Sequence, residues 1–351
     1  MTKMRRLPWV VPLLALLVLA LGAAGCGGGG DEEQGGGDTG TTATDEGGQQ
    51  GGGELKVGLV TDIGGLNDKS FNALAYAGLK SSQRRGITGR VITSKSPSDY
   101  IPNLQQLADD GFDPIISVGF LMTDATAKAA QAYPDTRFAI VDSAFDPPIE
   151  NAQGLLFKEQ ETGYLVGYLA GLVTKSGTIS SVGGQKIPPV DRFIAGYQKG
   201  AKDSNGSVKT LNGYSQDFVD QAKCKEIALN QIAQGSGVVF QVAGGCGLGA
   251  LDAAKQEGVW GIGVDADQAY LGDYVLTSAV KRVDVAVFKT IESAVNGDFK
   301  GGGVTTFGLA EDGVAFGKVS PKAPKEAVAK TRAQIDKIKN GEIEIPETVG
   351  G

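Results

Sequence analysis

The sequence has 351 residues, a formal net charge of −7 and no histidine. The absence of histidine removes the commonest general base and the commonest metal ligand. The sequence contains no basic tract and no basic patch interleaved with aromatic residues, which argues against nucleic acid as a partner. Neither a metal nor a cofactor is expected.

The N-terminus has the pattern of a secretory signal. Lys3, Arg5 and Arg6 precede an apolar run over residues 7–21, and small residues then lead to Cys26. The run is too short for a typical membrane-spanning helix. We predict a lipoprotein signal peptide over residues 1–26 with Cys26 as the lipid anchor. An ordinary cleaved signal and a membrane anchor are the alternatives.

Residues 27–53 consist almost entirely of Gly, Asp, Glu, Thr and Gln. Such a composition cannot bury enough apolar surface to fold, so this segment is predicted to be a disordered tether. The following ~300 residues are long enough for two domains. A lipid, a tether and a globular body together predict a protein anchored at the extracytoplasmic face of the cell membrane.

The first part of the globular body predicts a strand, a turn and a helix. Residues 57–60 form a short apolar run typical of a buried parallel strand. Residues 62–68 are rich in Gly, Asn and Asp, which tolerate turn conformations. Apolar residues near helical spacing begin at Phe71. Ligands of open α/β sheets bind at the carboxyl ends of such strands, so Asp62 and Phe71 are candidate binding residues.

The same alternation continues along the chain and then restarts. The first array has strands at 90–93, 114–119, 137–142 and 152–157, and helices at 99–110, 123–133 and 159–173. The second has strands at 178–183, 208–213, 238–242 and 260–264, and helices at 190–201, 220–234 and 249–256. Such repeats predict two parallel sheets with right-handed crossovers.

The last part of the chain is expected to complete the two lobes. A strand at 275–280 and a helix at 283–296 follow the second array, and this helix could return to the first lobe. Strands at 305–309 and 315–319 and a helix at 324–339 could close the second lobe. We therefore expect an N-lobe of residues 54–157 completed by about 282–300 and a C-lobe of 158–281 completed by about 301–351.

Polar residues recur where the predicted strands end. Asp62, Asp142 and Asp265 occupy this position, as does the loop at 244–247. Each aspartate alone could be a helix cap or a turn former. In two facing lobes, however, the strand ends converge on one cleft, where carboxylates can accept hydrogen bonds from a ligand. The repeated position favours a binding site.

The nature of the glycine-rich loops favours an uncharged polar ligand. The loop at 58–65 has neither the lysine nor the serine of a phosphate-binding loop, and the loop at 243–249 has only a G-x-G spacing. Phe71 and Phe218 are candidates for stacking on a flat ring, although core packing is the commoner role for an apolar residue on a helix such as Phe71. Lys281 follows a strand and could reach a ligand hydroxyl.

Two cysteines remain if Cys26 carries a lipid. Cys224 and Cys246 would then form an even pair in an oxidising compartment, which favours a disulfide. Two buried thiols that never meet are the alternative.

The sequence resembles the basic membrane protein family of substrate-binding lipoproteins. Motifs at residues 58–62 (GLVTD), 68–72 (DKSFN), 239–245 (VFQVAGG), 263–268 (GVDADQ) and 276–282 (LTSAVKR) carry the resemblance. The family implies a type I periplasmic-binding-protein fold, an α/β protein with two doubly wound lobes joined by a hinge. It also implies a monomer that has no enzyme activity and delivers nucleosides, purine nucleosides in particular, to the permease of an ATP-binding-cassette importer.

The resemblance assigns the ligand's base to four residues. Asp62 should bond the base or the sugar, Phe71 should stack on the base, and Asp142 should face the base edge. Phe218 should be the opposing ring, with Tyr214 as a competitor for that role.

The ribose hydroxyls should be held by Asp265 and Lys281, together with either Gly245 or Gly249. A bridge between Cys224 and Cys246 departs from several relatives and would stiffen this wall of the cleft.

Three other functions fit parts of the pattern. The protein could bind another small polar solute such as a sugar, or it could pass its ligand state to a membrane sensor. A secreted nucleoside hydrolase could use Asp62 and Asp142 as acid and base. The lipoprotein layout and the two lobes favour binding without chemistry.

Overall fold

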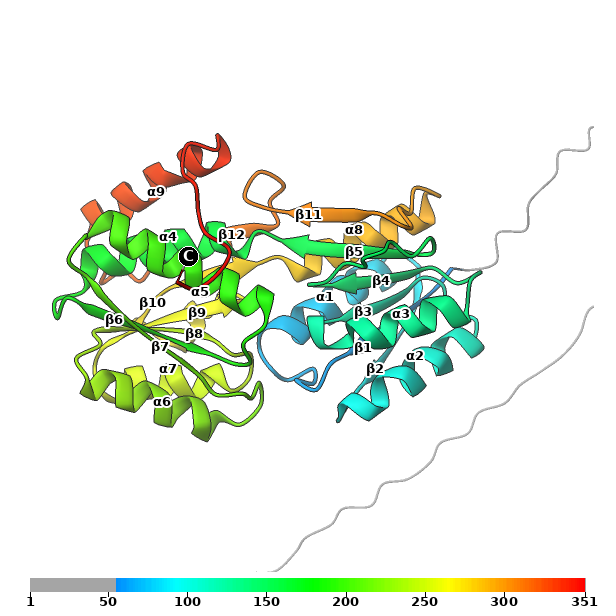
Figure 1. Ribbon diagram of the computed structural model, residues 1–351, viewed down its shortest axis with the longest axis horizontal. Helices are drawn as coiled ribbons and strands as arrows, with labels where there is room; N and C mark the ends of the chain where they lie inside the picture. Colours follow the sequence, from blue (N-terminus) through cyan, green and yellow to red (C-terminus); the bar gives the residue numbers. More distant parts are fainter. Residues whose placement is uncertain (1–54, 351) are drawn as a thin grey trace, which may run out of the picture. The chain divides into compact units, whose positions relative to one another are not determined.

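A computed structural model describes residues 55–350 of the chain (Figure 1). The predicted signal peptide, Cys26 and tether lie outside the described residues. Short 3-10 turns occur at Pro97–Asp99, Phe120–Met122 and Ala269–Leu271. No helix within the described range combines the length and apolarity needed to span a membrane.

The first lobe is built on a six-stranded sheet with the order β11-β5-β4-β3-β1-β2, and every pair in it is parallel. Its strands are β1 (Lys56–Thr61), β2 (Thr88–Thr93), β3 (Ile115–Val118), β4 (Phe138–Val141), β5 (Ala152–Phe157) and β11 (Val304–Phe307). Its helices are α1 (Phe71–Gln83), α2 (Tyr100–Asp109), α3 (Thr123–Ala132) and α8 (Val283–Val295).

Alternation along the buried strands explains why helices cover both faces of this sheet. Val57 and Leu59 of β1 pack in one apolar cluster with residues of α1 and α8. Val60, on the opposite face, packs with residues of α2 and α3. Successive side chains of a strand point to opposite faces, so an uninterrupted apolar strand needs a helical layer on each side. Figure 1 shows these two layers.

The second lobe has a six-stranded sheet with the order β12-β10-β9-β8-β6-β7, in which only β12 is antiparallel to its neighbour. Its strands are β6 (Thr178–Gly183), β7 (Lys209–Tyr214), β8 (Val238–Val242), β9 (Trp260–Asp265), β10 (Val275–Lys281) and β12 (Val314–Phe316). Its helices are α4 (Glu159–Val173), α5 (Pro188–Ser204), α6 (Gln221–Ala233), α7 (Gly247–Gln256) and α9 (Lys325–Lys339).

The chain passes between the two sheets three times. The passages join β5 to α4, β10 to α8, and β11 to β12. The third differs from the expectation that residues 301–351 complete the C-lobe, because β11 pairs with β5 in the first sheet. The strand sequence alone does not reveal this pairing, since Val304–Phe307 could add to the edge of either sheet.

Helices α4 and α5 approach each other closely along a row of glycines. A Cβ added to Gly163 or Gly167 of α4 would overlap the backbone carbonyl of Phe193 or Tyr197 in α5. Gly196 and Gly200 of α5 face α4 in the same way. The four-residue spacing of glycines in α4 therefore serves helix packing.

Candidate ligand-binding cleft

The carboxyl ends of both sheets line one cleft. Its open space amounts to about 610 Å³, including solvent at the mouth. Both lobes contribute to its wall, and the second lobe supplies Lys281 at the end of β10. The lining includes Asp62, Asp68, Phe71, Asn72, Asp142, Phe193, Phe218, Gly244, Gly245 and Asp265. Seven of the eight ligand-binding residues proposed from the sequence thus line a single cavity.

On the N-lobe side, the loop after β1 is held by its own carboxylates. Oδ1 of Asp62 accepts hydrogen bonds from the Gly64 amide (3.0 Å) and from Nδ2 of Asn72 (2.7 Å). Asp68 accepts from the amides of Ser70, Asn72 and Ala73 and so satisfies the first turn of α1. Asn72 therefore supports the loop. Burial raises the pKa of Asp62 to about 6, although both of its hydrogen bonds act in the opposite direction.

Four alternating charges extend from the cleft to the start of α4, where the chain passes from the first lobe to the second. Nζ of Lys281 lies 2.6 Å from Oδ1 of Asp142 and 2.8 Å from Oε1 of Glu159. Nε of Arg192 donates to the other oxygen of Glu159 at 2.6 Å. Glu159 has an exposed side-chain fraction of 0% and Lys281 of 1%. At such burial an unpaired charge is strongly unfavourable, so the ammonium and both carboxylates depend on one another.

The Lys281 ammonium also lies among aromatic rings. It is 5.2 Å from the ring centroid of Phe71, 4.8 Å from that of Phe157 and 5.8 Å from that of Phe193. These distances are within the range of cation–π attraction. The neighbouring carboxylates raise the pKa of Lys281 despite burial, which alone would lower it. The Lys281 amine therefore stays protonated among these three aromatic rings.

Asp265 joins the two lobes directly. Its Oδ2 accepts a 2.6 Å hydrogen bond from Oγ of Ser70, the residue that precedes α1. Burial raises the pKa of Asp265 to about 7, against the lowering effects of Lys281 and of the Ser70 hydroxyl. A buried carboxylate at this point can also accept a ligand hydroxyl from the cleft.

The two aromatic walls come from different kinds of structure. Phe71 is the first residue of α1, and Phe218 lies in the loop between β7 and α6. The ring of Phe218 lies over Gly184, where an added Cβ would overlap it. Tyr214, the competitor for this role, is outside the cleft lining and donates its hydroxyl hydrogen bond to Asp191 at 2.6 Å.

Gly245 and Gly249 differ in position. Gly245 lines the cleft. Gly249 lies inside α7, where an added Cβ would overlap the carbonyl of Gln221 in α6. The expectation that Gly249 contacts a ligand is therefore wrong, because the absent side chain makes room for helix α6.

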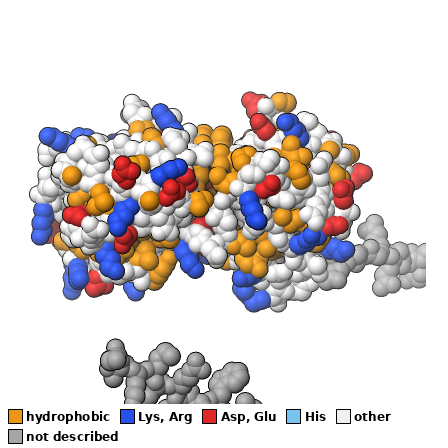
Figure 2. Space-filling view, turned by 90° about the horizontal axis from the view of Figure 1, so that it is seen from below, with side chains coloured by type: hydrophobic (Ala, Val, Ile, Leu, Met, Phe, Trp, Pro, Cys, Tyr) orange, Lys and Arg blue, Asp and Glu red, His pale blue; other side chains and the backbone are white. Residues whose placement is uncertain are grey.

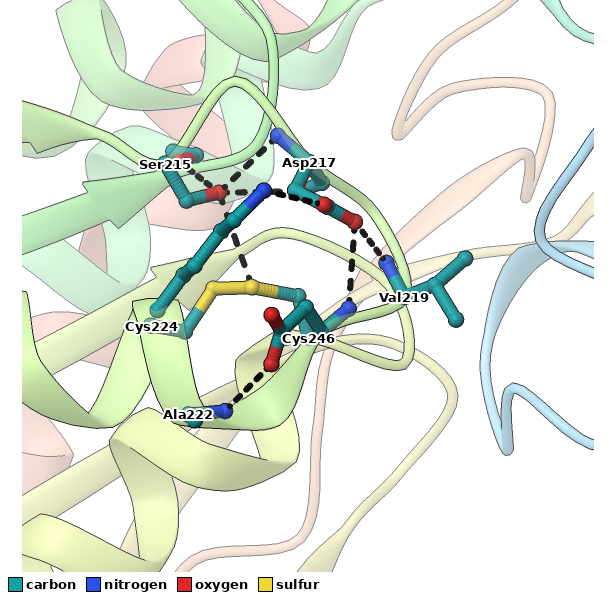
Figure 3. A network of polar contacts seen from close by, with 9 residues as sticks. Ser215, Asp217, Val219, Ala222, Cys224 and Cys246 are labelled. Atoms are coloured by element: carbon teal, nitrogen blue, oxygen red, sulfur yellow. Dashed lines mark hydrogen bonds and ion pairs between the residues drawn. A yellow bond between two sulfur atoms is a disulfide. The ribbon is translucent and has the colours of Figure 1, made fainter.

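Cys224 and Cys246 form a disulfide with a Cα–Cα distance of 5.6 Å (Figure 3). It connects α6 with the residue preceding α7, next to the cleft-lining Gly244 and Gly245. This is the bridge that the cysteine count favoured.

Four residues of the site were not identified from the sequence as contributors. These residues are Ser70, Glu159, Arg192 and Phe193. Lys281 is 122 residues from Glu159 and Asp265 is 195 residues from Ser70, so only the folded chain brings these pairs together. Ser70 lies within the DKSFN motif, which was the one available signal.

These features define a class of protein. Two α/β lobes, joined by three passages and enclosing a polar and aromatic cleft, are those of a substrate-binding protein with the periplasmic-binding-protein fold. A solute-binding protein from an ABC transporter system of Aeropyrum pernix K1 has a similar structure. Its TM-score is 0.74 at 28% identity, over 84% of this chain and 94% of that one. The predicted fold class is confirmed.

Sequence comparisons identify the family. Residues 55–349 match the Bmp family, described as ABC transporter substrate-binding protein PnrA-like. The ABC transporter nucleoside-binding protein BmpA of Lactococcus lactis is 36% identical over 317 residues, or 84% of this chain and 89% of the relative. Basic membrane protein A of Borreliella burgdorferi is 35% identical over 302 residues, or 83% and 87%. The chain belongs to the Bmp family of ABC transporter substrate-binding proteins, which are not enzymes.

Proposed function

We propose that this protein captures nucleosides in the cleft and delivers them to the permease of an ABC importer. The observation that carries the proposal is the pairing of two aromatic walls, Phe71 and Phe218, with buried carboxylates in one cavity. A nucleoside has a flat base that suits the rings and a ribose whose hydroxyls suit the carboxylates. The Lactococcus lactis relative is named as a nucleoside-binding protein, which supports the same ligand class.

The proposed contacts divide between base and sugar. Phe71 and Phe218 stack on the two faces of the base, while Asp142 and Asp62 bond its polar edge. Each stacking contact is worth roughly 0.5–1.5 kcal/mol beyond the area it buries. Asp265, Lys281 and the backbone at Gly245 hold the ribose hydroxyls. Hinge closure then brings the two lobes together around the ligand.

Position at the membrane follows from the N-terminal sequence in this proposal. Cys26 carries the lipid, and residues 27–53 tether the body at the extracytoplasmic face. The protein acts there as a monomer. The surface in Figure 2 intersperses Lys and Arg with Asp and Glu side chains, in agreement with a body that meets water on this face.

Calorimetry on the full-length protein in detergent tests the ligand class. Adenosine, guanosine and inosine should release heat on binding, and Phe218→Ala should weaken the interaction. Binding of a free sugar or an amino acid without any response to the three nucleosides would disprove the proposal. Loss of nucleoside uptake in cells that lack the protein, restored by the wild-type chain, tests delivery to a permease.

One observation favours a different activity, a nucleoside hydrolase. Burial raises the pKa of Asp62 and of Asp142, which suits a general acid. Membership in a family of substrate-binding proteins weighs against it. Chromatography after incubation with inosine distinguishes the two functions, since a binding protein returns intact inosine and a hydrolase returns free base.

A further inference from the structure

The loop that carries Phe218 has no regular secondary structure of its own. It runs from Ser215 to Asp220, between β7 and α6. A ring on such a loop can stack on a ligand with a fixed geometry only if other contacts hold its backbone, because loops are otherwise mobile. The structure provides these contacts from two directions (Figure 3).

The first set of contacts comes from the disulfide. The backbone amide of Cys246 donates a 2.9 Å hydrogen bond to the carbonyl of Phe218. Cys246 is bonded to Cys224 in α6, and both side chains are fully buried. The disulfide therefore fixes the position of the Cys246 amide, which is the hydrogen-bond donor to Phe218, relative to helix α6.

The second set of contacts is polar and local. Asp217 accepts hydrogen bonds from the amides of Val219 (2.8 Å) and Asp220 (3.0 Å), and from Nζ of Lys223 (2.8 Å). Oγ of Ser215 donates to the Asp217 carbonyl at 2.8 Å and lies 3.5 Å from Sγ of Cys246. These contacts fix the residues on either side of Phe218.

The position of the disulfide argues for a role beyond general stability. Helices α6 and α7 already pack through buried alanines such as Ala228 and Ala250. A covalent bond for stability could lie anywhere along this contact. It lies instead at the end nearest the cleft, one residue from Gly245, which lines it.

We propose that the Cys224–Cys246 disulfide and Asp217 are positioning groups that hold Phe218 in its stacking orientation and thereby set the affinity for an aromatic base. The inference rests on the proposed function. It adds a specificity-determining clamp, formed by Cys224, Cys246 and Asp217, to the C-lobe wall. No corresponding covalent support is present at Phe71 within the described residues.

A double-mutant cycle on the full-length protein tests the clamp. Inosine affinity is measured for the wild type, Cys224→Ala/Cys246→Ala, Phe218→Ala and the triple variant. We expect removal of the disulfide to weaken binding about threefold or more when Phe218 is present, up to the loss caused by Phe218→Ala itself, and to have almost no effect when Phe218 is absent. The same removal in a Phe71→Ala background should retain the loss, because that ring belongs to the other lobe.

Two outcomes would overturn the proposal. An equal loss with and without Phe218 would show that the disulfide acts only on the fold, and no loss in either background would show that it does not position the ring. If the wild type bound no nucleoside, the proposed function would fail instead. In that case the amide of Cys246 remains informative, because its hydrogen exchange should accelerate in the disulfide variant if the clamp holds this loop.

Asp217→Ala provides an independent variant if the cysteine variant does not fold. It leaves the disulfide in place and removes three hydrogen bonds from the loop. Binding should weaken in the same direction, again only when Phe218 is present. Lys225→Ala is the matched control, since Lys225 lies on α6, which the loop enters, and the variant removes an exposed ion pair with Asp252 of α7. A loss from Asp217→Ala that persists without Phe218 would contradict the inference.

Discussion

The two aromatic walls of the cleft face the same space but are supported by different means. Phe71 begins α1 and packs against the apolar cluster of the N-lobe, so regular structure and the core determine where its ring lies. Phe218 lies on a loop, and its backbone is held by hydrogen bonds and by a neighbouring disulfide.

This difference shows two ways to position the same chemical group. A ring at the start of a helix gains its position from folding itself, and substituting it affects both the core and the ligand. Phe218 also packs against the apolar cluster of its own lobe, but it belongs to no helix or strand, so the fold can better tolerate its loss. The variants below should reveal this asymmetry.

The largest effect is expected at Lys281, which lies between the two lobes. Lys281→Met leaves the carboxylates of Asp142 and Glu159 without their shared cation. Breaking a buried pair costs about 3–5 kcal/mol, so urea unfolding should show a loss of this size. Lys158→Met is the control, since its 3.6 Å pair with Glu161 is half exposed and should contribute less than about 1 kcal/mol. Equal losses would mean that the buried charges do not depend on each other.

The next effect compares the two rings directly. Phe71→Ala should lower the free energy of unfolding by about 1–3 kcal/mol, below the range for a fully buried ring because Phe71 is only half-buried. Phe218→Ala should lower it by less. Both should weaken nucleoside binding about three- to tenfold, as expected for loss of one stacking contact. The asymmetry would be refuted if Phe218→Ala proved the more destabilising of the two.

Gly184 offers a way to move the Phe218 ring without removing it. In Gly184→Ala the new methyl group overlaps the ring, which must shift. We expect a loss of affinity slightly smaller than that of Phe218→Ala, with little change in melting temperature. Gly206→Ala is the matched control because nothing lies within 4 Å of its added Cβ. An unchanged affinity in Gly184→Ala would show that the orientation of the ring does not matter.

A further effect should appear in the pH dependence of stability. Burial raises the pKa of Asp62 to about 6 and of Asp265 to about 7, above the ordinary 3.8. A raised folded-state pKa means that the folded protein binds more protons, so stability falls as pH rises from about 4 to these values. Asp62→Asn and Asp265→Asn should each remove the part of this loss of stability that comes from ionisation of its own carboxyl group.

Melting temperatures measured between pH 4 and 9 test this prediction. Relative to wild type, Asp265→Asn should gain stability up to about pH 7 and then stay constant, while Asp62→Asn should level off near pH 6. A difference between variant and wild type that does not change with pH would mean that the carboxyl groups are already ionised at pH 4.

The sequence predicted the N-lobe half of the site well because the relevant signals are local. A buried strand, a glycine-rich turn and the start of a helix place Asp62 and Phe71 within ten residues of each other. The strand ends at Asp142 and Asp265 were visible for the same reason. Local patterns of this kind are preserved when the chain folds.

The errors concern contacts between segments distant in the sequence. Strand β11 pairs with β5, about 150 residues earlier, and nothing in its four residues specifies that edge. Gly249 was assigned to the ligand, although its missing side chain accommodates α6. The charge network around Glu159 was not predicted because its partners lie on other elements, Arg192 on α5 and Lys281 on β10.

The glycine row between α4 and α5 has a mechanical consequence. Because the backbones touch at Gly163 and Gly167, the two helices cannot slide past each other without a steric clash. Helix α4 starts at the hinge with Glu159, and α5 carries Arg192 and Phe193. If α4 rotates about the hinge, α5 therefore moves with it as part of one rigid body. The C-lobe wall of the cleft then changes its orientation but not its internal geometry.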